Sequence, residues 1–390
     1  MIRALRLAWR YVLHHRFKSL LMVLCIALTV ALPIALAILL ASFNQQIVAR
    51  AQGTPLVVGA KGSPLDLTMH AIYFRTRPPG TIVQGVGEPV GDLGMSIPIH
   101  VRYTAQSVPV VGTTLEYFDF RRIGMATGTG LVRLGDCVLG ARAAERLGLE
   151  EGDSLLTDRE NVWDIAGSTP LKMRVGGVLA PTRSPDDDVV FVDLKTAWII
   201  EGLGHGHEDL EEEQDEDLVS GRENGVVTAR ATVTNFIEVT DENAASFHFH
   251  GNFEEFPVTA LIVVPNDEKG EALMLGRYQR EDAPAQMSKP IDEVQNLMQL
   301  VFRVQKFFNA NAILIGFSTA LLLVLVVLLS IRLRAGEMET MFKIGCARGT
   351  MASLIAAELF IIFVMAAACV GVVVTVTNWY ADDLVRSLLG

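Results

Sequence analysis

Cysteine is scarce in this 390-residue chain, and its scarcity limits how the fold can be held together. Of the four cysteines, Cys25 and Cys369 lie inside long apolar runs, and Cys346 lies in a short charged connector. Only Cys137 falls in the large central region, so this region cannot form a disulfide within itself. Its fold must therefore depend on a hydrophobic core of its own.

Nucleotide-binding and catalytic motifs are also absent from the sequence. The run Gly-Ala-Lys-Gly-Ser at 59–63 lacks the P-loop spacing Gly-x-x-x-x-Gly-Lys-Ser/Thr, and no other segment has it. The chain has no nucleophile elbow, no His-Glu-x-x-His and no paired-carboxylate context. We therefore predict a non-catalytic chain that does not hydrolyse ATP by itself.

The central region has little basic charge to balance its acids. The net charge of the chain is −11, and eight acidic residues lie between Glu208 and Asp217 alone. Such dense like charge repels itself and buries nothing, so we predict a mobile loop over residues 201–224. The acidic balance also argues against nucleic acid as a partner.

Apolar sequence, in contrast, is abundant, and the mean hydropathy is +0.35. Three apolar runs, residues 19–43, 310–331 and 351–377, are long enough to cross a bilayer as helices. The first run is longer than the apolar core of a typical signal peptide, and no small-x-small cleavage site follows it. We therefore interpret it as a retained anchor.

The basic residues near these runs predict their orientation. Residues 1–18 contain five Lys and Arg and no acid, and the connector 332–350 contains four Lys and Arg. Basic residues stay on the cytoplasmic side, so both segments should be cytoplasmic and residues 44–309 and 378–390 external. Residues 1–18 form either an amphipathic helix in the membrane surface or a simple basic leader.

The external region reads as short strands between turns, with one helix at 141–147, which is typical of a mixed α+β domain. Helical patterns flank it at 44–52 and 290–309, and each continues without a breaker into an apolar run. We therefore predict a membrane protein with α-helical spans and an external α+β domain on a two-helix stalk.

Two histidine pairs are candidate metal ligands. In Phe-His-Phe-His at 247–250, a strand would place His248 and His250 on one face, where adjacent imidazoles can bind Zn²⁺ or Cu²⁺. Two histidines supply only half of a tetrahedral site, so the interpretation as ordinary strand residues stays open. His205 and His207, in the acidic loop, form a second candidate, a loose metal scavenger.

The connector and the start of the last apolar run carry a family pattern. Residues 334–358 contain an arginine, a short helix led by a glutamate, an Ile-Gly turn and a later glutamate, Glu358. This pattern resembles the cytoplasmic signature of ABC transporter permeases of the MacB/LolC/FtsX type. Residues 110–118 and 138–153 look like the periplasmic core domain of that family, and residues 57–65 and 247–251 look like a bacterial subfamily of stand-alone permeases.

The resemblance implies a division of labour. Family members act as dimers bound to an ATPase, so we expect a permease homodimer with a separate ABC ATPase subunit that holds the ATP, and no cofactor in this chain other than the Zn²⁺ considered above. The implied function is mechanotransmission, in which ATP hydrolysis drives the export or extraction of a periplasmic substrate. The implied location is the bacterial inner membrane, with the large domain in the periplasm and a periplasmic protein or lipoprotein as a further partner.

The resemblance makes the connector a coupling helix that sits in a groove of the ATPase. A short helix would place Glu339 and Lys343 on one face, with apolar side chains beside them. A tight turn whose charges keep it out of the membrane is the alternative. The candidate ATPase contacts are Glu337, Met338, Glu339, Phe342 and Lys343.

Two further functions share these features. A signalling subunit of the FtsX kind would use the same stroke to activate a periplasmic hydrolase, and a metal-handling membrane component would use the histidines. The family has four spans, whereas this sequence has three followed by residues 378–390, a piece too short and too charged to cross. We therefore expect either a truncated sequence or a permease with three spans.

Overall fold

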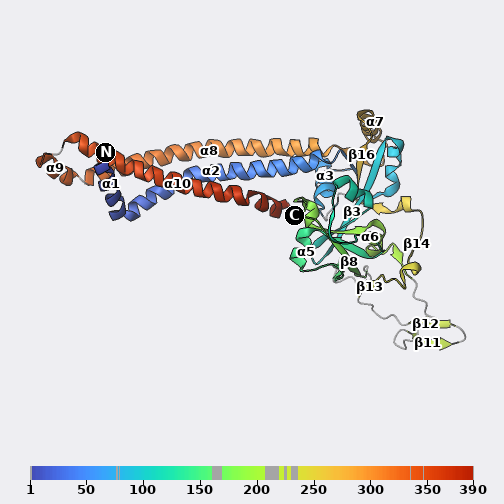
Figure 1. Ribbon diagram of the computed structural model, residues 1–390. Helices are drawn as coiled ribbons and strands as arrows, with labels where there is room; N and C mark the ends of the chain where they lie inside the picture. The colour runs from blue at the N-terminus through green and yellow to red at the C-terminus, as the bar shows by residue number, and fades with distance from the viewer. Residues whose placement is uncertain are drawn as a thin grey trace. The chain divides into compact units, whose positions relative to one another are not determined.

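The computed structural model describes residues 2–75, 78, 80–159, 169–206, 219–223, 226–229, 236–333, 335–345 and 347–389. The chain divides into two compact units (Figure 1). The helical unit comprises Met1–Ile47 and Asn296–Leu388. The sheet unit is built on Val48–Gln295.

The helical unit consists of long helices, because the apolar runs and their polar flanks form single uninterrupted elements. Its helices are α1 (Ile2–His14), α2 (Arg16–Gln52), α8 (Pro290–Leu333), α9 (Ala335–Lys343) and α10 (Arg348–Leu389). Within the part of the chain that the structure describes, three stretches, Arg16–Gln52, Pro290–Leu333 and Ala352–Val385, are long and apolar enough to cross a membrane. The segment expected as a tail, residues 378–389, continues α10 as helix.

The helices of this unit pack through a small apolar core. Met22 and Val23 of α2 meet Ile362 and Ala366 of α10, and side chains of α8 pack against this cluster. The hydroxyl groups of Thr29 in α2 and Thr319 in α8 lie 3.2 Å apart. Most of the large apolar side chains of α8 remain exposed.

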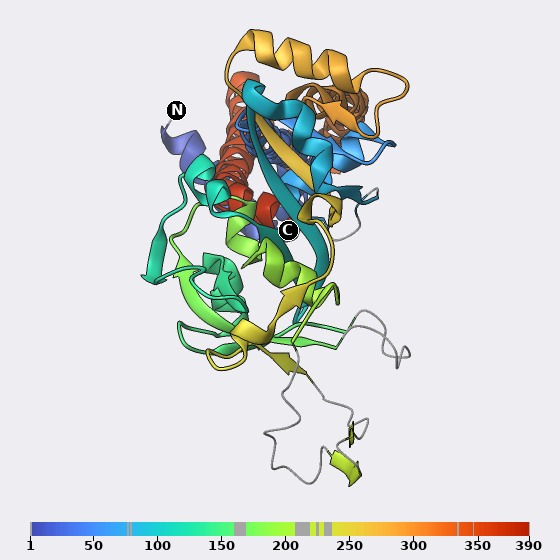
Figure 2. The ribbon, with the colours of Figure 1, turned by 90° about the vertical axis from the view of Figure 1, so that its right-hand side faces the viewer.

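The sheet unit contains one large mixed sheet. Nine of its eleven strands run in the order β13-β8-β6-β9-β4-β3-β16-β1-β17. The other two, β5 and β7, each pair with β8. The strands of this sheet are β1 (Leu56–Gly59), β3 (Gly94–Ala105), β4 (Val108–Thr113), β5 (Met125–Gly128), β6 (Asp136–Leu139), β7 (Ser154–Leu156), β8 (Leu171–Leu179), β9 (Val190–Asp193), β13 (Ile237–Glu238), β16 (Ala260–Pro265) and β17 (Gln286–Ser288). Figure 2 shows β3 and β16 side by side, as their antiparallel pairing requires.

Three two-stranded ladders accompany the large sheet. They pair β10 (Gly204–His205) with β14 (His248–Phe249), β11 (Val219–Glu223) with β12 (Val226–Ala229), and β2 (Ile82–Val83) with β15 (Pro257–Val258). The α-helices are α3 (Pro64–Tyr73), α4 (Leu115–Arg121), α5 (Ala141–Leu147), α6 (Leu194–Ile200) and α7 (Glu268–Tyr278). The 3-10 helices are η1 (Gln84–Leu93), η2 (Pro185–Asp188), η3 (Ala244–Ser246) and η4 (Phe253–Glu255).

Among the described residues, two hydrophobic clusters hold the sheet unit together. One gathers side chains from β4, β6, β8, β9 and α5, and the other gathers side chains from β1, β16, η1 and α7. Helix α6 contributes to both, because Ile199 faces the first cluster and Trp198 the second. Cys137 is buried and free, so the core holds this unit without a disulfide among the described cysteines. The predicted mixed α+β class is confirmed.

The structure corrects the predicted loop at 201–224. Residues 204–205 form β10 and residues 219–223 form β11, so both ends of the segment are paired strands. The acidic run itself lies outside the described residues.

Candidate functional site

The connector between α8 and α10 contains the short helix α9, which carries all five predicted ATPase contacts, Glu337 among them. The Lys343 ammonium lies 3.0 Å from a carboxylate oxygen of Glu339, so the predicted pairing of these two residues is present. Phe342 is 51% exposed and Met338 is half-buried. The helix therefore presents both a charged pair and an exposed aromatic ring.

The glutamate of the family pattern, Glu358, lies inside the apolar part of α10. It is buried, and a carboxylate oxygen lies 3.8 Å from the ammonium of Lys18 at the start of α2. A carboxylate within an apolar helix is costly without a countercharge. This pair therefore ties α2 to α10 within the helical unit.

A buried ion pair that the sequence analysis missed lies where α2 enters the sheet unit. Arg50, near the end of α2, donates two hydrogen bonds to the carboxylate of Asp186 in η2, of 2.8 and 2.9 Å. It also donates to the hydroxyl of Tyr117 at 2.9 Å and to the carbonyl of Ile72 at 3.2 Å. Tyr117 in turn donates to Asp186 at 2.6 Å.

This cluster, which we call the Arg50 joint, keeps its charges although it is buried. Burial alone would lower the pKa of Arg50, but the carboxylate of Asp186 outweighs it and the pKa is raised. Burial likewise would raise the pKa of Asp186, but the Arg50 guanidinium and the hydroxyl donors Ser184 and Tyr117 lower it. Both groups are therefore ionised at neutral pH.

A second link joins the entry and exit of the sheet unit. β1 begins four residues after α2 ends, and β17 ends two residues before α8 begins. β1 and β17 pair antiparallel, with Val57 opposite Ser288 and Gly59 opposite Gln286. The chain segments that follow α2 and precede α8 are therefore hydrogen-bonded neighbours in one sheet.

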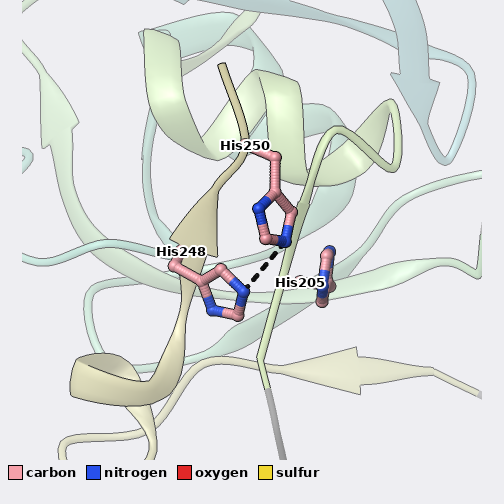
Figure 3. Close-up of side chains that lie close together, drawn as sticks. All are labelled: His205, His248 and His250. Carbon is pink, nitrogen blue, oxygen red and sulfur yellow. Dashed lines mark hydrogen bonds between the residues drawn. The ribbon is translucent and has the colours of Figure 1, made fainter. Parts of the chain in front are cut away.

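The predicted metal ligands His248 and His250 lie together, and the fold adds a third histidine. His205 in β10 stands directly opposite His248 in β14, and His250 follows two residues along (Figure 3). The ligand nitrogens of the three imidazoles lie within 4.8 Å of one another. His205 therefore belongs to a strand rather than to a loose loop, and His207 lies outside the described residues.

The chain is similar to a known protein family and to two solved structures. The family model of the MacB-like periplasmic core domain matches residues 19–245, more than half of the chain. The periplasmic region of MacB from Actinobacillus actinomycetemcomitans is 10% identical, with a TM-score of 0.35, over 65% of this chain and 98% of that one. The extracellular domain of the noncanonic ABC-type transporter YknZ from Gram-positive bacteria is 11% identical, with a TM-score of 0.32, over 60% of this chain and 99% of that one.

No curated protein matches the chain, so the family match carries the assignment. That match covers α2 and most of the sheet unit, including the Arg50 joint and β10. The family pattern at residues 334–358 lies beyond the matched residues, in α9 and α10. The chain therefore belongs to the MacB-like family and is an ABC transporter permease of the MacB/FtsX type.

Proposed function

We propose that this chain is the permease subunit of a mechanotransmission ABC transporter. A separate ATPase subunit binds and hydrolyses ATP, and the permease, acting as a homodimer, converts that work into movement of its periplasmic domain. The substrate is exported or extracted on the periplasmic side. The permease is not itself an enzyme in this scheme, since the sequence contains no P-loop.

The three long helices support a multi-pass arrangement in the bacterial inner membrane. Large side chains such as Leu28, Ile313 and Phe317 are exposed along them. Exposed apolar surface of this extent is stable in lipid but not in water. With the basic residues of the leader and the connector in the cytoplasm, the sheet unit is periplasmic.

The observation that carries the proposal is the shape of the connector. Between two long apolar runs the connector forms α9, a helix of nine residues, rather than a bare turn. Phe342 and Ile344, at its end, are 51% and 77% exposed. Aromatic side chains at a surface are the usual anchors of a protein interface, so α9 is suited to a groove in a partner.

The continuity of the helices supports the transmission of work. α2 is one helix from Arg16 to Gln52, and its last residues belong to the sheet unit, where the Arg50 joint fixes them. α8 likewise begins at Pro290, directly after β17. Because β1 and β17 are hydrogen-bonded to each other, displacement of either helix would load the same edge of the sheet.

The connector assignment is tested by removing its apolar anchors. Met338→Ala combined with Phe342→Ala should weaken binding of a co-expressed ABC ATPase subunit by about 2 kcal/mol or more, roughly thirtyfold, because truncating a buried interface anchor costs that much. Binding is measured by co-purification from detergent, and coupling by ATPase activity in proteoliposomes.

Thr340→Ala, an exposed change on the same helix, is the matched control and should bind as the parent does. Membrane insertion and thermal unfolding should be normal in all variants. If the double variant binds and stimulates its ATPase as the parent does, α9 is not the coupling helix.

A further inference from the structure

The pairing of β10 with β14 holds the histidine cluster together, because it places histidine opposite histidine and glycine opposite phenylalanine. The register pairs Gly204 with Phe249 and His205 with His248. Successive side chains on a strand point to opposite faces, so imidazoles occupy one face and phenyl rings the other. The sequence Gly-His-Gly at 204–206 thus complements Phe-His-Phe at 247–249.

The phenyl face anchors this ladder to the core. A Cβ on Gly204 would lie 2.5 Å from the ring of Phe249, and a Cβ on Gly206 would lie 2.9 Å from the ring of Phe247, so both glycines make room for the aromatic rings. Phe249 also packs against Trp198, with ring centroids 6.3 Å apart. This aromatic face is partly buried and packed against the core, and it fixes the orientation of the histidines on the opposite face.

A hydrogen bond to the backbone fixes the tautomer of His248 so that its other ring nitrogen can bind a metal. Nδ1 of His248 lies 3.0 Å from the carbonyl oxygen of Ser246, and a carbonyl can only accept, so Nδ1 carries the proton and donates. Nε2 of His248 then presents its lone pair, and it lies 3.1 Å from Nε2 of His250. A backbone carbonyl that fixes the tautomer of a ligand histidine is a common feature of metal sites.

The distances fit tetrahedral coordination. With Zn–N bonds of 2.0–2.1 Å, two nitrogens of a tetrahedral zinc site lie about 3.3 Å apart. The His248 and His250 nitrogens already have this spacing, and the ring of His205 is centred 4.7 Å from that of His248 and 5.2 Å from that of His250 (Figure 3). A small rotation of the exposed His205 ring would bring its ligand nitrogen to the same tetrahedral spacing from the other two.

We propose that His205, His248 and His250 bind Zn²⁺, each through one imidazole nitrogen, and leave the fourth position open. Zn²⁺ is four-coordinate with nitrogen ligands, and an open fourth position takes water or an incoming ligand. Cu²⁺ binds the same nitrogens more tightly by the general order of metal affinities, whereas Mg²⁺ and Ca²⁺ prefer oxygen. All of its ligands lie in the sheet unit, whereas α9 belongs to the helical unit.

Binding is measured by calorimetric titration of ZnCl₂ into the full-length protein in detergent, prepared without a polyhistidine tag. The expected result is one Zn²⁺ per chain with a dissociation constant on the order of 1 μM or below. Loss of an outer-shell partner alone costs about tenfold or more in metal affinity. Each of His205→Ala, His248→Ala and His250→Ala should therefore weaken binding at least as much.

Two control sets separate this site from other metal-binding groups. His14→Gln with His15→Gln, in the leader, should leave the titration unchanged. MgCl₂ and CaCl₂ should give no comparable binding. Circular dichroism in EDTA should show the same fold for every variant, since His205 and His250 are exposed and His248 is only half-buried.

A glycine pair tests the architecture without removing a ligand. Gly204→Ala forces the Phe249 ring to move and should weaken Zn²⁺ binding, whereas Gly276→Ala in α7, where a Cβ meets nothing within 4 Å, should not. Equal affinity of the two glycine variants would contradict a site built by the strand register. Absence of Zn²⁺ binding in the parent, or binding that persists in the triple His→Ala variant, would overturn the proposal.

Discussion

Two ion pairs in this molecule have similar geometry and very different surroundings. Glu339 and Lys343 lie 3.0 Å apart in α9, with side chains 66% and 72% exposed. Arg50 and Asp186 lie 2.8 Å apart, with side chains 9% and 2% exposed. Water screens the first pair and its side chains lose entropy on pairing, so it contributes little, whereas the second pair cannot lose one partner without leaving a buried charge.

The difference in exposure between the two pairs suits the two roles that the proposed function gives to α9 and to the Arg50 joint. α9 is a short helix whose internal contacts contribute little stability, which suits a segment that a partner can grip and orient. The Arg50 joint connects the end of α2 to η2 and to Tyr117 of α4 through charge-assisted hydrogen bonds that all lie inside the sheet unit. Under the proposed function, the connector that is to be moved is therefore weakly stabilised, and the joint that is to transmit the movement is rigid.

The largest effect is expected at the joint. Asp186→Asn leaves the Arg50 guanidinium buried without its countercharge, and should lower the free energy of unfolding by about 3–5 kcal/mol. Thermal unfolding of the purified protein, followed by circular dichroism, measures the change.

The neighbouring Asp188→Asn is the matched control. Asp188 pairs with Arg142 at 3.2 Å, and the Arg142 side chain is substantially exposed, so its loss should cost about 1 kcal/mol or less. Equal shifts for Asp186→Asn and Asp188→Asn would mean that the joint is no stiffer than an ordinary surface pair.

A second, pH-dependent effect should come from His70, which is buried in α3. Its pKa is lowered from an ordinary value of 6.5 to about 4, mainly because the ring is buried; a hydrogen bond with the carbonyl of Arg75 acts in the opposite direction, and the nearby His100 adds a smaller lowering effect. The unfolded chain therefore binds a proton between these pH values and the folded chain does not. Stability should fall as pH drops from about 6.5 to about 4, by about 3 kcal/mol in total, and stay flat above this range.

His70→Gln should remove this part of the acid sensitivity. The measurement is the thermal midpoint of parent and variant at several pH values between 4.5 and 7.5. The exposed His14→Gln is the control and should keep the slope of the parent. An unchanged slope in His70→Gln would show that other groups account for the acid sensitivity.

The two regions also differ in how far the sequence predicts them. The helices α2 and α8 follow from local pattern, since apolar length and three- and four-residue spacing act within a single segment. Helix α5 was predicted at Ala141–Leu147, where the structure has it. Helix α6 was missed, because six of its seven residues are buried and it has no polar face to show a period.

The sites depend on pairings that local pattern does not encode. The Arg50 joint needs α2 and η2 to meet, and the histidine cluster needs the register of β10 on β14. A register shift of one residue would turn His248 to the other face. The spacing of histidines along the sequence therefore could not predict that His205 joins His248 and His250 in one cluster. The complementary Gly-His-Gly and Phe-His-Phe segments were the available signal, since phenyl rings facing glycines favour this register.

The smallest effect is expected at α9. Glu339→Gln breaks an exposed pair between residues four apart on a helix, which contributes about 0.3–0.5 kcal/mol, so the thermal midpoint should stay close to that of the parent. If α9 docks into an ATPase, the same change should alter how fast the two subunits associate, because exposed interface charges act mainly on association rates. The rate should differ from the parent at low salt and converge with it at high salt, where these charges are screened. Stopped-flow association with a labelled ATPase subunit measures this dependence. A loss of stability comparable to that of Asp186→Asn would remove the contrast between a weakly stabilised connector and a rigid joint.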